Sequence, residues 1–382
     1  MRSRMEPSWY TDERWFRLEE ARLFGRLWQF FTLKMLVAAP DAFVVRTLGG
    51  RSIVLQNMAG TLRAFDNVCL HRQAPLQDQP EGVRPLVCPY HAWRYDAEGR
   101  PSIPQHDELY RFDAAERAAL RLRSYPVEVV GNLVFISLAE RPLSIEEQLA
   151  PAFLDALRAC SSRFDDEVMV TTLRGRFNWK LAYENLRDVN HPRFIHARSL
   201  ARAFTFAPDV DEGRVRHARA LHASDAPLGR DAALAELRDF SWGGLDAPAT
   251  TEPLPWHARV ERLGDADGYL NWLVFPNLHV ASPSGGRSFT IEHHVPVAPD
   301  RTDVIVHWVT ATKRAPYDES TAVLYAHMVA GEPVLTEDLE VLAGVQASLA
   351  RGAPRAHLGD YEHMNLRVER WYAAVMEGAL ER

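Results

Sequence analysis

The sequence predicts an α+β protein of two domains: a small all-β domain, then a larger domain with helices over an antiparallel sheet. The chain has 382 residues, too many for one small core. Short β-branched runs broken by Gly, Asn and Asp fill its first third, and strand and helix patterns mix in the remainder. We place an N-terminal helical segment that packs on the larger domain at 1–34, the small domain at 35–142 and the larger domain at 143–382.

Residues 11–31 are expected to form an amphipathic helix. Phe16, Leu23, Leu27 and Phe30 recur there at helical spacing. This apolar stripe predicts packing against another domain rather than a solvent-exposed helix.

The small domain is expected to be a series of hairpins. Three apolar runs between residues 43 and 65 are separated by Gly49-Gly50 and Ala59-Gly60. The segment 125–138 should close this domain.

The larger domain is expected to alternate strands and helices around one loop-rich insertion. Residues 208–257 have weak periodicity and read as an elaborated loop over a site. The expected strands are 167–173, 258–263, 269–275, 288–297 and 303–313, and the expected helices are 144–159, 178–196, 318–330, 333–350 and 360–378.

Composition and charge exclude several classes of protein. The formal net charge of −7 argues against a nucleic-acid partner, which would favour a basic face. The sequence contains no apolar run of the length of a membrane-spanning helix, so we expect a soluble, cytoplasmic protein without a membrane partner. Three cysteines are too few for a disulfide scaffold. Cys160, which stands apart from the other two, is expected to be a buried structural residue.

Two short pairs of metal-type ligands stand in the small domain. Cys69 and His71 form a Cys-x-His pair, and Cys88 and His91 form a Cys-x-x-His pair. Pairs this tight present both side chains from one loop tip. Facing each other, they would make a cage of two sulfur and two nitrogen ligands, which suits either zinc or a [2Fe–2S] cluster.

A second cluster of potential ligands lies about a hundred residues downstream. Asp188 and His191 are three residues apart and share a helix face. His196 is five residues beyond His191, which a regular helix would turn away. Because Pro192 loosens the helix at that point, a distorted or ending helix would bring both imidazoles onto one target.

Two imidazoles need a carboxylate to complete the usual iron site with open positions. Asp338 lies on an apolar stripe between Leu335 and Leu342, where a carboxylate is costly unless it is paired or bound to a metal. Its neighbours Glu337 and Glu340 point off the stripe and are expected to be solvated. We therefore predict Asp338 as the third ligand.

Together the two clusters resemble one known family over nearly the whole chain: the Rieske non-heme iron oxygenases, specifically the α-subunits of ring-hydroxylating dioxygenases and related monooxygenases. The resemblance rests on Cys69-x-His71-Arg72 with Cys88-Pro89-Tyr90-His91-x-Trp93, on Asn178-Trp179-Lys180 with Glu184-Asn185-x-x-Asp188-x-x-His191-x4-His196, and on Glu337-Asp338 followed by Gln346. Three positions depart from the family pattern: Gln73 and Ala92 replace the usual glycines, and Asn190 replaces a common tyrosine.

The resemblance implies the cofactors and their ligands. A [2Fe–2S] cluster on Cys69, His71, Cys88 and His91 would receive electrons in the Rieske domain. A mononuclear Fe(II) on His191, His196 and Asp338 would bind oxygen beside the substrate in the catalytic domain.

The resemblance also implies partners. Electrons would pass between neighbouring subunits of a ring-shaped homotrimer, with or without a separate β-subunit. The Asp188 carboxylate would bridge that interface, bonded to His191 of its own chain and to a Rieske histidine of the adjacent chain, His91 being preferred. The sequence contains no Gly-x-Gly-x-x-Gly fingerprint, so NAD(P)H oxidation is assigned to a separate reductase, with or without a ferredoxin.

The substrate pocket is expected on strands 269–279 and 288–295 and just after His196. Most of these residues are apolar or aromatic, which favours an aromatic or other hydrophobic substrate. The expected lining residues are Leu200, Phe204, Phe206, Asn277, His279 and His293.

The same residues are compatible with other functions. Within the oxygenase class, the alternative is a monooxygenase or demethylase acting on a methoxyarene or a quaternary amine, the latter needing an aromatic cage. Outside it, a pure electron carrier would have no use for the His191, His196 and Asp338 set, and a hydrophobic-ligand binding module would show no oxygen uptake.

Overall fold

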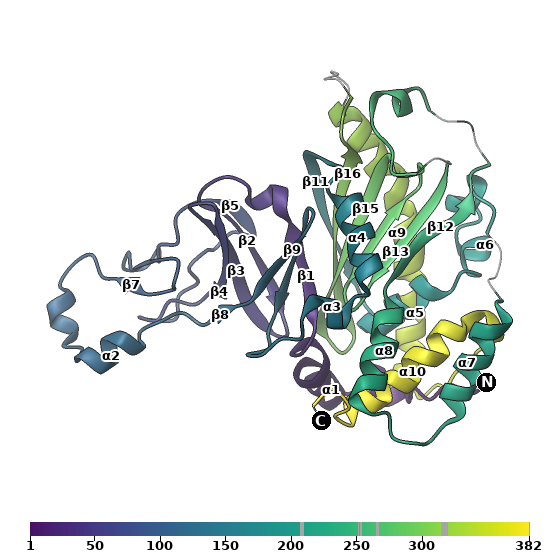
Figure 1. The fold of residues 1–382 in the computed structure, drawn as a ribbon, viewed down its shortest axis with the longest axis horizontal. Helices are drawn as coiled ribbons and strands as arrows, with labels where there is room; N and C mark the ends of the chain where they lie inside the picture. The colour runs from purple at the N-terminus through teal and green to yellow at the C-terminus, as the bar shows by residue number, and fades with distance from the viewer. Residues whose placement is uncertain (207–209, 251, 253, 265–266, 315–319, 382) are drawn as a thin grey trace. The chain divides into compact units, whose positions relative to one another are not determined.

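The computed structural model describes the whole chain except residues 207–209, 251, 253, 265–266, 315–319 and 382 (Figure 1). It divides into two compact units, one of residues 24–142 and one of residues 1–23 with 143–382. We call them the β unit and the α+β unit. Each has its own buried core.

The β unit consists of small antiparallel sheets. Its five-stranded sheet has the order β5-β2-β3-β4-β8, its three-stranded sheet the order β1-β10-β9, and β6 pairs with β7. The elements are β1 (Trp28–Leu33), β2 (Ala42–Leu48), β3 (Arg51–Met58), β4 (Thr61–Asp66), β5 (Glu81–Val83), β6 (Arg94–Tyr95), β7 (Pro101–Ser102), α2 (Ala114–Ala119), β8 (Ser124–Tyr125), β9 (Val127–Val130) and β10 (Leu133–Ser137).

The expected hairpins are confirmed. The turn between β2 and β3 uses Gly49 and Gly50, whose φ angles are +50° and +71°. Two consecutive positive φ angles match the tight turn that follows the twist of paired strands, and glycine adopts them without steric cost. One core cluster of this unit contains Cys69 and Cys88, so the two thiols are part of its packing.

The predicted helix over residues 11–31 is wrong in its second half. The helix α1 (Glu13–Glu19) continues only as a wider turn to Phe24, and residues 28–33 form β1. All six residues of β1 are buried, so its apolar residues lack the alternation that distinguishes a strand from a helix.

The α+β unit is built on one six-stranded antiparallel sheet of order β11-β16-β15-β14-β13-β12 (Figure 1). Its strands are β11 (Phe164–Gly175), β12 (Trp242–Pro248), β13 (Gly268–Val274), β14 (Leu278–Ser282), β15 (Ser288–Ala298) and β16 (Arg301–Ala311). Its other helices are α3 (Ile145–Gln148), α4 (Pro151–Ser161), α5 (Trp179–Arg187), α6 (Pro192–Ile195), α7 (Glu212–Ala223), α8 (Arg230–Phe240), α9 (Ser320–Ala350) and α10 (His363–Met376).

The long helix α9 packs on β11, β15 and β16 and carries Asp338 to the site. Leu335 packs with Val304, Val306 and Trp308 in the core between helix and sheet. A Cβ at Gly331 would lie 2.6 Å from the Trp308 ring, so the close approach of α9 to β16 requires glycine there.

Three sequence expectations for this unit are wrong. One helix runs from Ser320 to Ala350 through Pro333, where two were expected. Residues 258–263 form no strand, only an isolated bridge from Val260 to Lys313. The expected loop over 208–257 contains α7, α8 and β12, although residues 207–209, 251 and 253 lie outside the described part.

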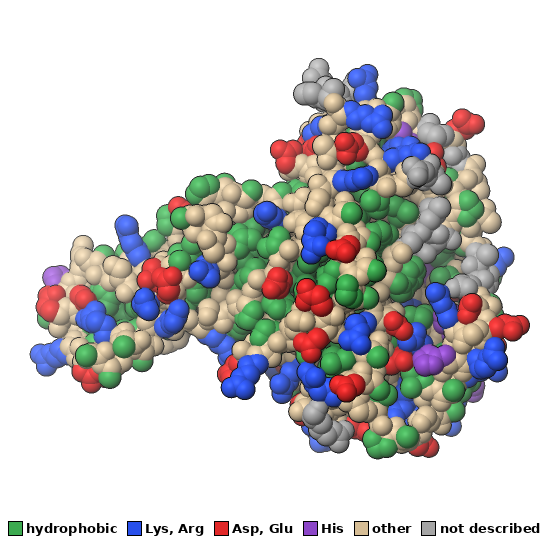
Figure 2. All heavy atoms as spheres, in the orientation of Figure 1, with side chains coloured by type: hydrophobic (Ala, Val, Ile, Leu, Met, Phe, Trp, Pro, Cys, Tyr) green, Lys and Arg blue, Asp and Glu red, His purple; other side chains and the backbone are tan. Residues whose placement is uncertain are grey.

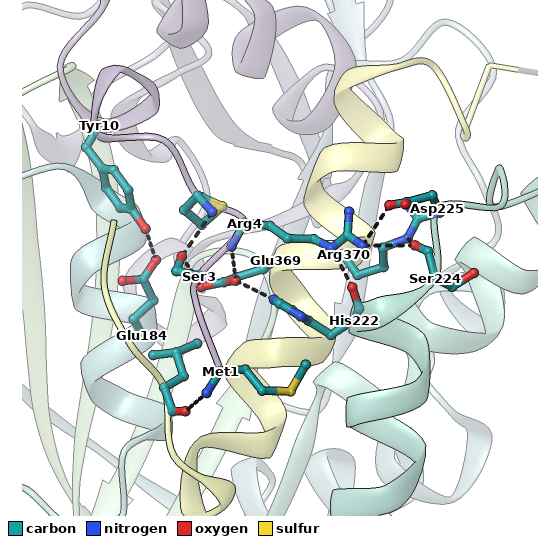
Figure 3. A network of polar contacts seen from close by, with 12 residues as sticks. Met1, Ser3, Arg4, Tyr10, Glu184, His222, Ser224, Asp225, Glu369 and Arg370 are labelled. Carbon is teal, nitrogen blue, oxygen red and sulfur yellow. Dashed lines mark hydrogen bonds and ion pairs between the residues drawn. The ribbon is translucent and has the colours of Figure 1, made fainter. Parts of the chain in front are cut away.

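The first residues of the chain are bound to α7 and α10 by buried polar contacts (Figure 3). Glu369 on α10 accepts hydrogen bonds from the Ser3 hydroxyl (2.6 Å) and the Arg4 backbone N–H (2.7 Å). The His222 Nε2 atom on α7 lies 3.1 Å from the same carboxylate. These contacts fix the N-terminal segment to the α+β unit.

A second set of contacts fixes this segment to α5, the helix that leads to the second ligand cluster. Tyr10 donates a hydrogen bond of 2.6 Å to Glu184. The fully buried Glu19 carboxylate accepts from the Trp179 indole (2.8 Å) and pairs with the Lys180 ammonium. The Asn178-Trp179-Lys180 motif therefore positions α5.

Charged side chains of both signs are interspersed over the face shown in Figure 2, without one large basic region there. Within the described residues, we find no helix with the length and apolar character needed to cross a membrane.

Candidate metal centres and catalytic cavity

The first candidate centre lies at two loop tips of the β unit with the same backbone geometry. In each loop the cysteine N–H donates to the carbonyl five residues later (2.8 Å), and the cysteine carbonyl accepts from the amide four residues later (3.0 Å). Cys69 and Cys88 are buried, whereas His71 is half-buried and His91 is exposed. The thiols thus lie at the inner side of the cage and the imidazoles at its outer side.

The donor set fits a metal group. The His71 and His91 ring centroids are 4.5 Å apart, and the His71 Nδ1 atom is buried without a hydrogen-bond partner, as expected for a ligand atom. Burial, with His91 and Arg72, lowers the pKa of His71 and favours the neutral imidazole that binds metals. Burial raises the pKa of the Cys88 thiol, so its thiolate needs a metal to stabilise it.

Aromatic residues hold this cage from outside. Trp93 stacks on the His71 ring at 5.0 Å, and the Tyr110 hydroxyl lies 3.4 Å from His71 Nε2. The Tyr95 hydroxyl accepts the Leu70 N–H (3.0 Å), which leaves its own O–H free to donate to Cys69 Sγ at 3.2 Å. Sequence reasoning missed Tyr95 and Tyr110, because neither belongs to a ligand pair.

The second candidate centre forms where α5 ends and α6 begins. The helix α5 starts at Asn178, whose side chain caps the Lys180 N–H, and leaves helical geometry at Asp188. A new helix starts with Pro192, which lacks the amide hydrogen that a first-turn residue does not need. His191 and His196 flank this four-residue helix, which accounts for their spacing of five.

The structure brings His191, His196 and Asp338 together. One possible ligand atom from each lies within 4.8 Å of the others. Asp338 Oδ1 is 3.6 Å from His191 Nε2 and 3.2 Å from His196 Nε2, and it is buried without a hydrogen-bond partner. Two imidazoles and one carboxylate that converge in this way fit a mononuclear iron.

Each imidazole of this centre is oriented through its other nitrogen. His191 Nδ1–H donates to the Asp188 backbone carbonyl at 2.5 Å, and His196 Nδ1–H donates to Glu337 at 2.8 Å. Ser199 also donates to Glu337, at 2.6 Å. Burial lowers the pKa of His191. Burial also acts to lower the pKa of His196, but the Asp338 and Glu337 carboxylates outweigh it there, so the pKa of His196 is raised.

Two expectations about this centre need correction. Glu337 points off the apolar stripe as expected, but it is half-buried and hydrogen-bonded rather than solvated. Within this chain the Asp188 carboxylate bonds the Asn190 N–H (2.8 Å), while His191 uses the Asp188 backbone carbonyl. Backbone geometry at the end of α5 decides this, and helix-face arithmetic does not reveal it.

A cavity of about 1220 Å³ opens beside the second centre, and all three candidate ligands line it. Of the expected pocket residues, Leu200, Phe204, Phe206 and His279 line this cavity. Asn277 and His293 lie outside the lining, buried and with Nδ2 and Nε2 at 3.0 Å from each other. His293 lies on the sheet that forms the cavity wall and Asn277 lies in the turn before β14, but both side chains are buried outside the cavity.

Family comparison accounts for both centres. Residues 28–126 match the family model for the Rieske [2Fe–2S] domain, and residues 166–378 match that for the catalytic domain of the ring-hydroxylating α-subunit. The chain belongs to the Rieske ring-hydroxylating oxygenase α-subunit family. The β unit is thus the Rieske domain, and the α+β unit contains the catalytic domain.

Curated relatives fall into two groups. The chain is 32% identical over 197 residues to a glycine betaine monooxygenase oxygenase subunit of Pseudomonas aeruginosa, covering 50% of this chain and 44% of that protein. It is 30% identical to a carnitine monooxygenase oxygenase subunit of Escherichia coli, over 48% of this chain and 49% of that one. The aligned stretch is about half the length of these relatives. The large oxygenase component of a naphthalene 1,2-dioxygenase system of Pseudomonas aeruginosa is 26% identical. That alignment covers 77% of this chain and 68% of the dioxygenase component.

Solved structures share the fold. A quaternary ammonium Rieske monooxygenase bound to an inhibitor superposes with a TM-score of 0.71 at 19% identity, covering 98% of this chain and 95% of that chain. Naphthalene 1,2-dioxygenase from Rhodococcus sp. bound to indole gives a TM-score of 0.70 at 18% identity, with the same coverage.

The two departures in the Rieske loops coincide with unusual backbone angles. Gln73 and Ala92, each four residues after a candidate ligand cysteine, have φ angles of +54° and +56°. Only glycine adopts this region without steric cost, which explains why the family pattern has glycine at both positions. This chain keeps the loop geometry with two strained residues.

Proposed function

We propose that this chain is the oxygenase component of a multicomponent Rieske oxygenase. One observation carries the proposal: a two-thiol, two-imidazole cage and a two-histidine, one-carboxylate site occur in the same chain. When bound, the [2Fe–2S] cluster on Cys69, His71, Cys88 and His91 and the Fe(II) on His191, His196 and Asp338 supply single-electron transfer and dioxygen activation.

The protein's own residues prepare the catalytic site for this chemistry. The Asp188 carbonyl and the Glu337 carboxylate hold the two imidazole N–H groups, so both Nε2 atoms face Asp338. Anchors of this kind fix the ring orientation and raise the basicity of the ligand nitrogen. The cavity beside them is the proposed substrate-binding site.

Electrons are proposed to come from NAD(P)H through a separate reductase, with or without a ferredoxin, in the cytoplasm. Transfer would cross between subunits of a homotrimer, from the exposed His91 of one subunit to the Asp188 carboxylate of another, with or without a β-subunit. The Asp188 carboxylate is half-buried, and its Oδ1 accepts from Asn190 within the chain. Asp188→Asn should leave both metal groups bound and nearly abolish turnover; full activity would contradict the bridging role.

The proposed reaction is hydroxylation of an aromatic or other hydrophobic small molecule. Leu200, Phe204 and Phe206 in the cavity lining support this substrate class. A second candidate is a monooxygenase or demethylase that acts on a quaternary amine or a methoxyarene. The glycine betaine and carnitine monooxygenase relatives favour the quaternary amine.

Iron content and oxygen uptake test the proposal together. The oxygenase reading expects about three iron atoms per chain, against about two for a pure electron carrier. With a reductase and NADH, oxygen uptake should depend on substrate and should disappear in Asp338→Ala. A ligand-binding module would show neither iron nor uptake, and either result would reject the proposal.

A further inference from the structure

The sheet wall of the catalytic cavity is polar along β15. Successive inward-facing residues of this strand are Ser288, Thr290 and Glu292, and all three line the cavity. At the Glu292 end the polar groups bond one another. The Glu292 carboxylate lies 3.0 Å from His279 Nδ1 and 3.3 Å from His294 Nε2. The charge of Glu292 is therefore engaged within the wall, and the Thr290 end needs a separate account.

The helix α9 lies along β15 beside the cavity, and two contacts fix how they are aligned (Figure 1). His327 Nε2 lies 3.4 Å from the Thr290 hydroxyl oxygen. Leu335 shares a core cluster with Val306, which pairs with Glu292 in the sheet register. The helix and the strand therefore run in the same direction, with His327 level with Thr290 and Leu335 level with Glu292.

His327 lies far from the candidate iron ligand of this helix. It is eleven residues before Asp338, which corresponds to about three turns and about 16 Å along the helix axis. Both residues line the cavity, and so do four small or apolar residues between them: Ala330, Gly331, Val334 and Leu335. The cavity thus extends along an apolar helix face from the iron site to a far end at Thr290 and His327.

Four polar residues are buried at this far end. Ser284, Ser288, Thr290 and His327 all line the cavity, and each is at most 9% exposed. Burial lowers the pKa of His327 to about 4, so its imidazole is neutral at physiological pH. The four side chains are therefore polar without carrying a charge.

The hydroxyl groups at this end keep hydrogen-bonding capacity for a further partner. Ser284 Oγ and Ser288 Oγ lie 2.9 Å apart, so one hydroxyl donates to the other and the second hydrogen remains for another acceptor. Whether the Thr290 hydroxyl or His327 donates in their contact, the threonine oxygen keeps a position that can accept. Residues 288 and 290 are about 7 Å apart on one face of the strand, which leaves room for one oxygen atom to bond both at about 2.8 Å.

We infer that Thr290, Ser284 and Ser288 form a subsite for a hydroxyl group at the end of the substrate remote from the iron. A substrate hydroxyl would accept a hydrogen bond from the serine pair and donate one to Thr290. The matching substrate class is an elongated neutral alcohol or phenol with an apolar body. This inference rests on the proposed oxygenase function, and it names Thr290 and Ser288 as specificity-determining residues.

Binding to the iron-loaded protein under anaerobic conditions tests the inference without turnover. The probes are 6-phenylhexan-1-ol and 1-fluoro-6-phenylhexane, in which a fluorine of similar size replaces the hydroxyl. Equilibrium dialysis measures the affinity of each. Because only the alcohol makes the two hydrogen bonds, we expect it to bind about fivefold more tightly or better.

Proton relaxation of the bound alcohol tests where its hydroxyl lies. Paramagnetic Fe(II) speeds the relaxation of ligand protons near it. Relative to the metal-free protein, iron should increase the relaxation rates of the ring protons more than those of the CH₂–OH protons. The reverse order would place the hydroxyl beside the iron and overturn the remote subsite.

Variants assign the preference to residues. Thr290→Val keeps the shape and removes the acceptor, and Ser288→Ala removes one hydroxyl of the serine pair. Each should reduce the ratio of alcohol to fluoride affinity to about twofold or less. Thr310→Val is the matched control and should leave the ratio unchanged, because Thr310 is buried opposite Ser288 on β16 but does not line the cavity. If one of the first two variants does not fold, the other decides.

The outcomes separate this inference from the proposed function. Equal binding of the alcohol and the fluoride, or an unchanged ratio in the variants that fold, overturns the hydroxyl subsite. Substrate-dependent oxygen uptake with NADH and a reductase, without any advantage for the alcohol, overturns the subsite and leaves the oxygenase function standing. Absence of the mononuclear iron rejects the oxygenase function, whereas the binding ratio still tests the subsite.

Discussion

Replacing Glu184 by glutamine should remove much of the fall in stability with rising pH. Glu184 lies on α5 and is half-buried, and the Tyr10 hydroxyl donates a hydrogen bond of 2.6 Å to its Oε1 (Figure 3). Burial raises the pKa of Glu184 to about 8, and the nearby Glu369 adds to this shift. Glutamine keeps the side-chain volume and the acceptor for Tyr10, but it has no proton to lose.

Proton linkage determines the direction in which stability changes with pH. In the unfolded chain Glu184 has its ordinary pKa of 4.5, whereas in the folded chain it keeps its proton up to a pH of about 8. Between these values the folded state binds more protons, so stability is full below pH 4.5 and is lost as pH rises to 8. From pH 5 to pH 8 the loss has an upper limit of about 4 kcal/mol, at 1.36 kcal/mol per pH unit.

Thermal unfolding of wild type and Glu184→Gln between pH 5 and 8 measures how much of the pH dependence of stability comes from Glu184. The wild-type Tm should fall by on the order of 5–10 °C more than that of Glu184→Gln over this range. Glu340→Gln is the matched control, because Glu340 is exposed on α9 and should leave the wild-type slope unchanged. Parallel pH profiles for wild type and Glu184→Gln would refute the assignment of a protonated, buried Glu184.

Four further variants test the metal centres. Gln73→Gly and Ala92→Gly should each stabilise the Rieske domain by about 0.5–1 kcal/mol in denaturant unfolding, because they relieve positive φ angles; a loss of stability would contradict that strain. Glu337→Ala should weaken iron binding about 10- to 100-fold in a chelator titration, because the His196 imidazole loses its anchor, and unchanged affinity would exclude this role. Tyr95→Phe should lower the cluster reduction potential by about 40–80 mV in a redox titration, since one hydrogen bond to a ligand sulfur is lost; an unchanged potential would exclude that bond.

The parts of the fold that were predicted correctly carry strong local signals. The hairpins between residues 43 and 65 are marked by glycine turns, and β13, β15 and β16 by apolar runs near their observed bounds. The errors occur where tertiary packing overrides local pattern. Separate helices were expected at 318–330 and 333–350, but α9 continues through Pro333 and packs against β11, β15 and β16.

The cavity could be predicted only in part. Phe204 was placed correctly because it follows His196 closely in sequence, and His279 because its strand was expected to line the pocket. His293 was expected in the lining, but it alternates with Glu292 along β15 and points to the opposite face. The phase of that alternation depends on strand register, which one sequence does not reveal. The polar nature of the wall was therefore missed.

Ligands and their anchors differ in how the sequence encodes them. The candidate cysteine and histidine ligands come in tight pairs, so their spacing reveals them, whereas Asp338 comes from a distant helix and was found from its place on an apolar stripe. The Asp188 carbonyl anchors His191 from three residues away, but other contacts come from distant segments: Glu337 is 141 residues from His196, and Tyr110 is 39 residues from His71. A chain that kept every candidate ligand and lost Glu337 would keep the same ligand spacing, yet its His196 ring would lack the contact that orients it. Motif matching thus identifies where a metal can bind, whereas the folded structure is needed to judge how well the ligands are held.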